Sequence, residues 1–420
     1  MEWRPDQRRV VITGMGVLAA NGSDISTFWS SLMEGRSAAR YVTRFDVSAI
    51  PTKIAAEITD FDSLRYMNPK TARRLDRSLQ YSVAAARMAS EDSGIDFSTF
   101  DPDRVGVVEG TSLSNNESAH KTEVAIAKRG YRAISPSALI NGYCGGGSGE
   151  IAYELGIKGH AITVCSGSAS GNDAIGYAFN MVRNDEVDLM VAGGAEAPLL
   201  PSVMGGFSFN RVMTRRNDPP PQAMRPFDRD RDGFLLGEGG AFLVLEELSH
   251  ALYRNARIYA EILGHGRSCE AYHPVTPHPE GLGIHRAMEK AMRQARLDVG
   301  AIDYVNAHGT ATESNDVVET RAIKRLFGGH SSRIAVSSTK PVTGHLMAAA
   351  GALETVVCVL SLVNGEIPMT LNLANPDEGL DLDYVRGESR HYPVRNVMNL
   401  NTGFGGKNSC LILGRFDGNG

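Results

Sequence analysis

Short runs of β-branched and other apolar residues alternate with longer amphipathic stretches along the whole chain. This alternation predicts an α/β protein in which strands and helices follow one another. The expected strands include Val10–Thr13, Val105–Val108, Ala161–Val164, Leu189–Ala192, Ala241–Glu246, Tyr304–Asn306, Ile334–Ser337 and Ser409–Leu413. The expected helices include Ser78–Asp92, Asn172–Arg183, Gly283–Ala295 and Asp316–Leu326.

The second half of the chain repeats a pattern of the first half. A strand that ends in Gly-Thr occurs at Val105–Thr111 and again at Tyr304–Thr310. In each half a later strand passes through a turn of small residues into a helix, first in ITVCSGSASGNDAIGYA and then in AVSSTKPVTGHLMAAAGALE. Two copies of one α/β unit would place these two turns side by side, so they are candidates for one shared site. We divide the chain into domains 1–254 and 255–420.

Charge and cysteine content limit the partners and the compartment. The net charge is −5 and the sequence pI is about 6.1, which favours neither nucleic acid nor an anionic membrane as a partner. Five cysteines at irregular spacing, without a CxxC pair, indicate reduced thiols and a cytoplasmic protein. No signal peptide is visible, and no apolar run reaches the roughly 20 residues that span a bilayer.

The segment Ile162–Gly171 has the features of a nucleophile site. Its small residues let a substrate approach the backbone closely, and the following helix start supplies unpaired N–H groups and a positive dipole end. These features suit a nucleophile and an oxyanion hole. An ordinary capped helix start remains the alternative.

Two histidines and a lysine lie in the corresponding part of the second half. His308 and His345 each follow a predicted strand and are flanked by Gly and Thr, and Lys340 precedes His345 by five residues. Two neutral imidazoles could donate hydrogen bonds to a developing enolate or thioester oxygen. Lys340 could supply positive charge and Glu354 could pair with it, although a purely structural ion pair would leave the same pattern.

Two other motifs are weaker. Gly14-Met15-Gly16 superficially resembles a dinucleotide fingerprint, but no acidic residue ends a clear second strand, so a tight turn is favoured. The segment Asp228–Gly233 faintly resembles a calcium loop but lacks the glutamate expected at its twelfth position. The cysteines show no ligand spacing, so we expect no metal site.

Five stretches in a fixed order carry a family resemblance: VVITGMGVLAANG, RPFDRDRDGFLLGEGGAFLVLEE, VNAHGTATESND, SSTKPVTGHLMAAAGALE and NTGFGGKN. On these the chain resembles the β-ketoacyl-ACP synthases, particularly the elongating type II fatty-acid enzyme and its polyketide ketosynthase relatives. The resemblance implies a thiolase fold, with two duplicated α/β halves in a five-layer αβαβα arrangement. It also implies a catalytic nucleophile, two catalytic histidines and a catalytic lysine.

The resemblance assigns roles by motif. The histidines are His308 and His345, and the lysine is Lys340. Phe404, in GFGG, matches the gating phenylalanine whose backbone N–H helps to form the oxyanion hole.

Further positions match residues of the family that contact the substrate or its carrier. Thr310 and Thr312 match threonines that hold the phosphopantetheine arm, and Leu113 matches a residue that gates the acyl pocket. The basic residues that resemble those docking the acidic carrier protein are Lys70, Arg73, Arg74 and Arg211.

The family nucleophile is a cysteine, and this chain departs from that pattern. The cysteine follows a GxxG turn by nine residues, and Gly159 plus nine is Ser168. From Ser168 the following helix also falls into the register of the family, as far as Glu196. Cys165 lies three residues earlier, on the predicted strand, and would shift that register. We therefore place Ser168 at the nucleophile position.

The serine has three explanations. It is an engineered replacement of cysteine, which we favour, or a natural variant that performs acyl transfer or decarboxylation. Alternatively, the chain is a non-condensing partner subunit, like a chain-length factor, although such partners usually lose a histidine and this chain keeps both. A hydroxyl is far less acidic than a thiol, so we expect impaired acyl transfer.

The activity implied by the resemblance is a decarboxylative Claisen condensation. An acyl chain on an acyl carrier protein would be joined to malonyl-ACP, in fatty-acid synthesis or in a type II polyketide or polyene pathway. The resemblance implies no permanently bound cofactor, because the phosphopantetheine arm of the carrier protein carries the substrate. It implies a homodimer or a heterodimer with a homologous ketosynthase-like subunit. A degradative thiolase is disfavoured by the motifs of the second half.

Overall fold

The structure is a computed structural model that describes residues 8–113 and 116–418. Its strands are β1 Val10–Ala19, β2 Arg40–Tyr41, β3 Ile54–Ala55, β4 Val105–Gly110, β5 Ala161–Val164, β6 Leu189–Glu196, β7 Gly239–Glu247, β8 Ala260–Cys269, β9 Tyr304–Asn306, β10 Ala335–Ser337, β11 Glu366–Ile367, β12 Arg390–His391, β13 Asn396–Gly403 and β14 Lys407–Gly414. Its α-helices are α1 Ile25–Met33, α2 Pro69–Arg74, α3 Arg77–Ser93, α4 Asn116–Arg129, α5 Ala138–Asn141, α6 Gly146–Leu155, α7 Ser170–Arg183, α8 Pro201–Phe209, α9 Leu248–Tyr253, α10 Leu282–Ala295, α11 Glu313–Phe327, α12 Lys340–Thr343 and α13 Ala350–Asn364.

Each half of the chain builds five strands in the same order. The strands run β5-β4-β6-β7-β1 in the first half and β10-β9-β13-β14-β8 in the second. The strand directions also match. The second strand in each order, β4 or β9, is parallel to both of its neighbours. The remaining pairs, β6-β7 and β7-β1 in the first half and β13-β14 and β14-β8 in the second, are antiparallel. A short antiparallel pairing of β1 with β8 joins the two sheets into one hydrogen-bonded set. The predicted duplication is therefore present.

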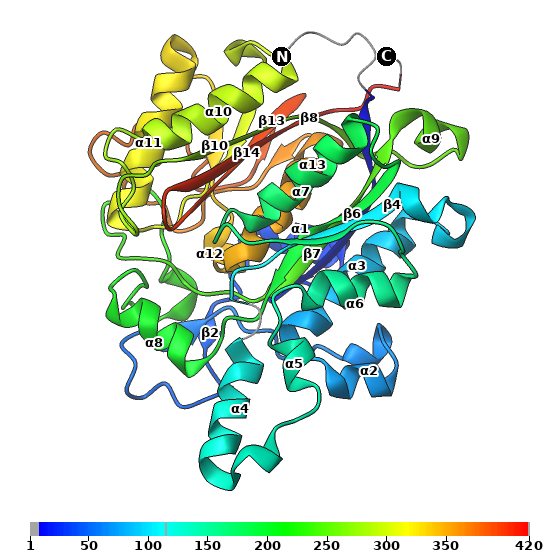
Figure 1. The fold of residues 1–420 in the computed structure, drawn as a ribbon. Helices are drawn as coiled ribbons and strands as arrows, with labels where there is room; N and C mark the ends of the chain where they lie inside the picture. The colour runs from blue at the N-terminus through cyan, green and yellow to red at the C-terminus, as the bar shows by residue number, and fades with distance from the viewer. Residues whose placement is uncertain (1–7, 114–115, 419–420) are drawn as a thin grey trace.

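The sheets and helices form five layers (Figure 1). Helices α7 and α13 lie between the two sheets, α3 and α6 cover the outer face of the first sheet, and α10 and α11 cover the outer face of the second. The insertions that carry β2, α4, α5 and α8 lie together beyond one end of the layers. The largest hydrophobic cluster contains residues of both sheets and of α7 and α13, so the two halves share one core.

The Gly-Met-Gly segment after the first strand is not a turn, and that prediction is wrong. Gly14 and Gly16 both lie inside β1, which is longer than expected. A Cβ at Gly16 would lie 2.0 Å from the carbonyl oxygen of Ala85, so the missing side chains let α3 lie directly on the strand.

The second half uses the same device. Gly264 and Gly266 lie in β8, and a Cβ at Gly266 would lie 2.0 Å from the carbonyl oxygen of Ala287 in α10. The glycine pairs are thus helix-packing sites of the duplicated unit, with no relation to a dinucleotide.

The two central helices also touch through glycines. A Cβ at Gly171 of α7 would lie 2.7 Å from the backbone nitrogen of Ala352 in α13, and one at Gly351 would lie 2.7 Å from that of Asn172. The stretch Met347–Asn364 has the length and hydropathy of a membrane span, but 89% of it is buried inside the protein, as in a core helix. This close contact brings the start of α7 next to the segment that leads into α13.

Candidate active site

Ser168 lies at the N-terminal end of α7, between the two sheets. Strand β5 ends at Val164, Gly167 takes a positive φ of 67°, and α7 begins at Ser170. The Ser168 side chain is buried, and its Oγ lies 3.0 Å from Nε2 of His345. A hydroxyl at a helix start faces unpaired N–H groups and a positive dipole end, which favour developing negative charge.

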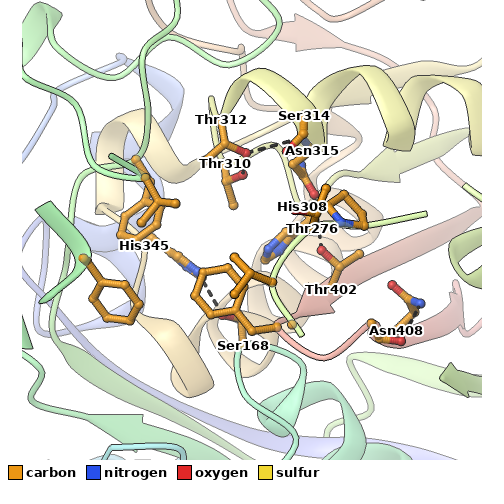
Figure 2. A pocket seen from close by; sticks show the side chains of 18 of the residues that line it. Ser168, Thr276, His308, Thr310, Thr312, Ser314, Asn315, His345, Thr402 and Asn408 are labelled. Atoms are coloured by element: carbon orange, nitrogen blue, oxygen red, sulfur yellow. Dashed lines mark hydrogen bonds between the residues drawn. The ribbon is translucent and has the colours of Figure 1, made fainter. Parts of the chain in front are cut away.

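The two predicted histidines come from the second half and meet at this point. His308 follows β9, and His345 follows α12, the short helix after β10. Their ring centroids are 5.3 Å apart at an interplanar angle of 84°. Figure 2 shows His345 reaching toward Ser168, with His308 beside them.

Both imidazoles are held neutral. Burial and the nearby Lys340 cation lower the pKa of His345 well below 6.5. The pKa of His308 is lowered in the same way, with a further contribution from His345. A neutral imidazole can accept the Ser168 proton at Nε2 in the tautomer that carries its proton on Nδ1, and it can donate a hydrogen bond in the other tautomer.

Lys340 is fully buried and paired. Its Nζ donates to Oε1 of Glu354 at 2.6 Å, and Asn401 donates to the other carboxylate oxygen at 2.9 Å. The predicted ion pair between Lys340 and Glu354 is therefore present. A hydrogen-bonded pair in this position keeps a fixed cation beside the imidazoles.

The loop after β13 packs against the nucleophile loop. A Cβ at Gly403 would lie 2.7 Å from the carbonyl oxygen of Ser166 and 3.1 Å from the backbone nitrogen of Ser168. The next residue, Phe404, is 45% exposed, and its ring centroid lies 6.1 Å from that of Phe207. Only a glycine at position 403 allows the backbone of this loop to reach Ser168.

A cavity of about 290 Å³ opens onto these groups. Its wall includes Ser168, His308, His345 and Phe404, together with other polar and apolar side chains, some of which Figure 2 labels. The cavity-lining residues are Ser168, Phe207, Asn210, Val212, Phe234, Glu270, Val275, Thr276, Pro277, His308, Thr310, Thr312, Ser314, Asn315, His345, Met347, Thr402, Gly403, Phe404, Gly406 and Asn408. Thr310 and Thr312 lie on it together, their hydroxyl oxygens 3.1 Å apart.

Sequence reasoning missed Glu319, which supports the His308 loop. Its carboxylate accepts the backbone N–H groups of His308 and Gly309 at 2.6 and 2.8 Å. Burial raises the pKa of Glu319 to about 7. The available sequence signal was its position, because Glu319 precedes Ala322 and Ile323 by three and four residues and so interrupts the apolar face of the expected helix.

Cys165 and Leu113 lie away from the cavity wall. Cys165 follows the end of β5 and is exposed, and it does not line the cavity that contains Ser168. Leu113 packs against the hydrophobic cluster that includes Phe234 and Met347, both of which line the cavity. Leu113 thus lies behind the part of the cavity wall that Phe234 and Met347 form.

The four residues expected to dock the carrier protein differ in their exposure and in their ion pairing. Lys70, Arg73 and Arg211 are exposed. Arg74 is half-buried and forms a two-pronged ion pair with Glu150, with N–O distances of 2.5 and 2.6 Å. Its charge is already neutralised within the chain.

The segment Asp228–Gly233 has a structural role. Asp228 is fully buried, and its Oδ2 accepts the backbone N–H groups of Ala374 and Asn375 at 2.9 and 2.8 Å. Over residues 8–113 and 116–418, no group of three or more His, Cys, Asp or Glu side chains is placed to hold a metal ion.

Comparisons with known proteins place this geometry in a family. The family model for the β-ketoacyl synthase N-terminal domain matches residues 7–251, and the model for the C-terminal domain matches residues 259–374. The chain is 43% identical over 410 residues to 3-oxoacyl-[acyl-carrier-protein] synthase 2 of Coxiella burnetii, a match that covers 98% of this chain and 99% of the relative.

Two solved structures are similar over nearly the whole chain. The ishigamide ketosynthase/chain length factor matches with a TM-score of 0.92 and 36% identity, covering 98% of this chain and 100% of the other. A type II PKS ketosynthase in complex with its acyl-carrier protein matches with a TM-score of 0.91 and 29% identity, covering 98% and 100%. The five-layer arrangement is thus the expected thiolase fold. By its matching models, its full-length relatives and its architecture, the chain belongs to the β-ketoacyl synthase family.

Proposed function

We propose that this protein is a β-ketoacyl-ACP synthase that uses Ser168 as its nucleophile. The observation that supports this most directly is the 3.0 Å contact between Ser168 Oγ and His345 Nε2 at a helix N-terminus. His308 and the Lys340 cation lie beside that contact, and the cavity connects it to the surface loops.

The first step is transfer of an acyl chain from the carrier protein. Ser168 Oγ attacks the thioester carbonyl of the acyl chain while its proton passes to Nε2 of His345. The backbone N–H groups of Ser168 and Phe404 stabilise the oxyanion. The C–S bond then breaks, the phosphopantetheine sulfur leaves as a thiol with the proton from His345, and an acyl ester remains on Ser168.

The second step is condensation with a malonyl-type extender. The extender loses CO2, and hydrogen bonds from His308 and His345 stabilise the enolate oxygen that forms. The enolate carbon attacks the acyl ester, the bond to Ser168 Oγ breaks, and Ser168 takes up a proton from solvent. The product is a β-ketoacyl chain, two carbons longer, on the carrier protein.

The carrier protein reaches this site through its phosphopantetheine arm, which is the substrate carrier and no permanent cofactor. Thr310 and Thr312 both line the cavity, which supports a role in holding the arm. Lys70, Arg73 and Arg211 are exposed cations that suit an acidic carrier. One of the similar solved structures is a ketosynthase in complex with its acyl-carrier protein, which supports this partner.

The chain also suits a dimer with itself or with a homologous subunit. One structural neighbour is a ketosynthase/chain length factor, and a non-condensing partner of that kind is the second candidate function. The serine in place of a cysteine favours that candidate. The joint presence of His308, His345 and Lys340 in one site favours the condensing enzyme.

Condensation assays of three forms test the proposal. Acyl-ACP and malonyl-ACP are supplied to the parent protein, Ser168→Cys and Ser168→Ala, and β-ketoacyl-ACP is measured by mass spectrometry. A thiol is activated far more readily than a hydroxyl, so Ser168→Cys should exceed the parent rate by at least tenfold, as an order of magnitude. Ser168→Ala should form no product.

Two results would change the assignment. An alanine variant as active as the parent would remove Ser168 from the reaction. A Ser168→Cys variant that is inactive alone but supports an active homologous subunit would make this chain the partner subunit.

A further inference from the structure

Four buried polar side chains form a network behind the nucleophile, outside the cavity. Asp173, in the first turn of α7, accepts a 2.6 Å hydrogen bond from Ser166 Oγ. Its other oxygen lies 3.3 Å from Nε2 of His265 in β8, and the same nitrogen lies 3.1 Å from Ser409 Oγ in β14. None of these four residues lines the cavity.

One end of the network lies in the loop that contains Ser168, and the other lies in β14, the strand that follows the loop containing Phe404. Ser166 is two residues before Ser168, and Ser409 is three residues after Gly406, where the loop that contains Phe404 has entered β14. The loop that contains Ser168 and the loop that contains Phe404 touch near Ser166, since a Cβ at Gly403 would lie 2.7 Å from the carbonyl oxygen of Ser166. The network therefore links both sides of the point where the loops touch.

The His265 ring fits tightly in its place. A Cβ at Gly176 of α7 would lie 2.2 Å from Nδ1 of His265, so the ring sits directly on the helix backbone. The backbone N–H of His265 donates to Gln294 of α10 at 2.7 Å. The ring thus lies against the backbone of α7, and the backbone of the same residue is fixed by α10, so the ring has little room to turn away from Asp173.

The carboxylate at the centre is charged although it is buried. Burial alone would raise the pKa of Asp173, but hydrogen bonds from His265, Ser166 and Ser409 hold it below its usual value. An ionised group inside a protein is costly unless it is fully hydrogen-bonded, and this one receives several donors. Charged hydrogen bonds of this kind fix the positions of their donors more firmly than neutral ones.

We propose that Asp173 and His265 are positioning residues that fix the oxyanion hole, by holding the Ser166–Ser168 loop and the strand that follows the Phe404 loop in a set relation. This inference rests on the proposed function, since it concerns transfer of the acyl chain to Ser168. Neither side chain touches the substrate. Their effect is on the placement of the Ser168 and Phe404 N–H groups, for which an error of 1 Å is enough to cost about a hundredfold in rate.

Separate measurement of the two half-reactions tests the proposal. The variants are Ser166→Ala, Asp173→Asn and His265→Phe, and the matched control is Ser90→Ala, which removes a buried hydroxyl that donates to Ala86 O within α3. Acylation of Ser168 from acyl-ACP is followed by rapid quench and intact mass. Release of CO2 from malonyl-ACP is followed in the absence of an acyl donor.

We expect the three network variants to lose about tenfold to a hundredfold in the acylation rate, because oxyanion stabilisation is impaired. Release of CO2 should stay within about twofold of the parent, because it depends on His308 and His345. Ser90→Ala should change neither rate. A loss of acylation without a loss of CO2 release cannot come from misfolding, since misfolding lowers both rates together.

Three results overturn the proposal. The first is unchanged acylation in all three variants, and the second is a parallel loss of both rates in Ser166→Ala, the least disruptive change. The third is a parent protein that never acylates Ser168, which overturns the proposed function and this inference with it. In the first two cases the parent still acylates, so the proposed function stands.

Discussion

Ser168 and Cys165 are three positions apart, yet only the serine reaches His345. The count of nine residues from Gly159 predicted this from the sequence, because helix register is fixed by spacing and survives a change of side chain. The duplication predicted that the two turns lie side by side, but not which atoms touch, since Ser168 Oγ and His345 Nε2 are 177 positions apart in the chain. The supporting groups Glu319 and Asp173 were missed for the same reason, as their partners lie on other elements.

At the residue scale, His345 should be essential for decarboxylation. His345→Ala removes one of two hydrogen bonds to the forming enolate and should abolish CO2 release from malonyl-ACP. Because burial and Lys340 hold the pKa of both histidines well below 6.5, neither imidazole should take up a proton as the pH falls from about 8 to 6, and the NMR signals of both rings should stay unshifted over that range. Unchanged CO2 release in His345→Ala, or a His345 ring signal that titrates with a midpoint near 6.5, would contradict this role.

Removal of the buried lysine charge should destabilise the fold. Lys340→Met leaves the Glu354 carboxylate without its 2.6 Å partner, and breaking a buried pair costs about 3–5 kcal/mol in the free energy of unfolding. Urea denaturation at pH 8 measures it. The double variant Lys340→Met, Glu354→Gln removes both charges and should recover much of the loss. Equal denaturation midpoints for the parent and the single variant would show that the pair does not stabilise the protein.

At the element scale, the expected strands all lie in the ten-stranded sheet, but β8 and β13 were not among them and several strand ends were misplaced. The predicted strands Ala161–Val164 and Tyr304–Asn306 match β5 and β9. Strand β6 continues through Gly193–Glu196 and β1 through Gly14–Ala19, because glycines in these strands serve close packing and carry no β-propensity signal. Pattern analysis treats such glycines as chain breaks, which is why Gly-Met-Gly was misread as a turn.

The glycine contact between α7 and α13 predicts a sharp difference between two alanine substitutions. Gly171→Ala places a methyl group 2.7 Å from a backbone nitrogen of α13, so the helices must separate, and the free energy of unfolding should fall by about 1–3 kcal/mol. The matched control, Gly149→Ala in α6, meets no atom within 4 Å and should be neutral or slightly stabilising. Denaturant melts measure both. Equal stability of the two variants would rule out a tight helix contact.

At the scale of the whole molecule, neither half holds a complete site. The first half provides Ser168, and the second provides His308, His345 and Lys340. The repeated turns of small residues predicted this arrangement, since two copies of one α/β unit place equivalent turns side by side. The short distance between α7 and α13 could not be predicted from the sequence, because it depends on how the glycines of the two helices pack against each other.

The free edge of the sheet should be a dimer contact. Strand β5 lies at one end of the strand order, and among the residues that the structure describes β4 is its one strand partner, so its outer edge presents unpaired backbone groups. The carbonyls of His160 and Val164 accept bonds from residues of the β4 segment, so by alternation the Thr163 N–H points outward. We expect the parent to sediment at twice its chain mass of 45.2 kDa, alone or with a homologous subunit.

The matched variants for this prediction are Thr163→Pro and Thr163→Ala. Proline removes the outward N–H and should shift the mass toward the monomer, whereas alanine keeps the N–H and should leave the dimer intact. A parent protein that stays monomeric both alone and with a homologous ketosynthase subunit would argue against strand pairing at this edge.

The central claim is that one site, built from both halves, directs the acyl chain to Ser168. The most direct test is to incubate the protein with acyl-ACP, digest it, and locate the acyl group on the peptide that contains both Cys165 and Ser168. The account predicts an adduct on Ser168 that resists neutral hydroxylamine, as an oxygen ester does, and that is absent from His345→Ala. An adduct on Cys165 that hydroxylamine removes, as it does a thioester, would contradict it.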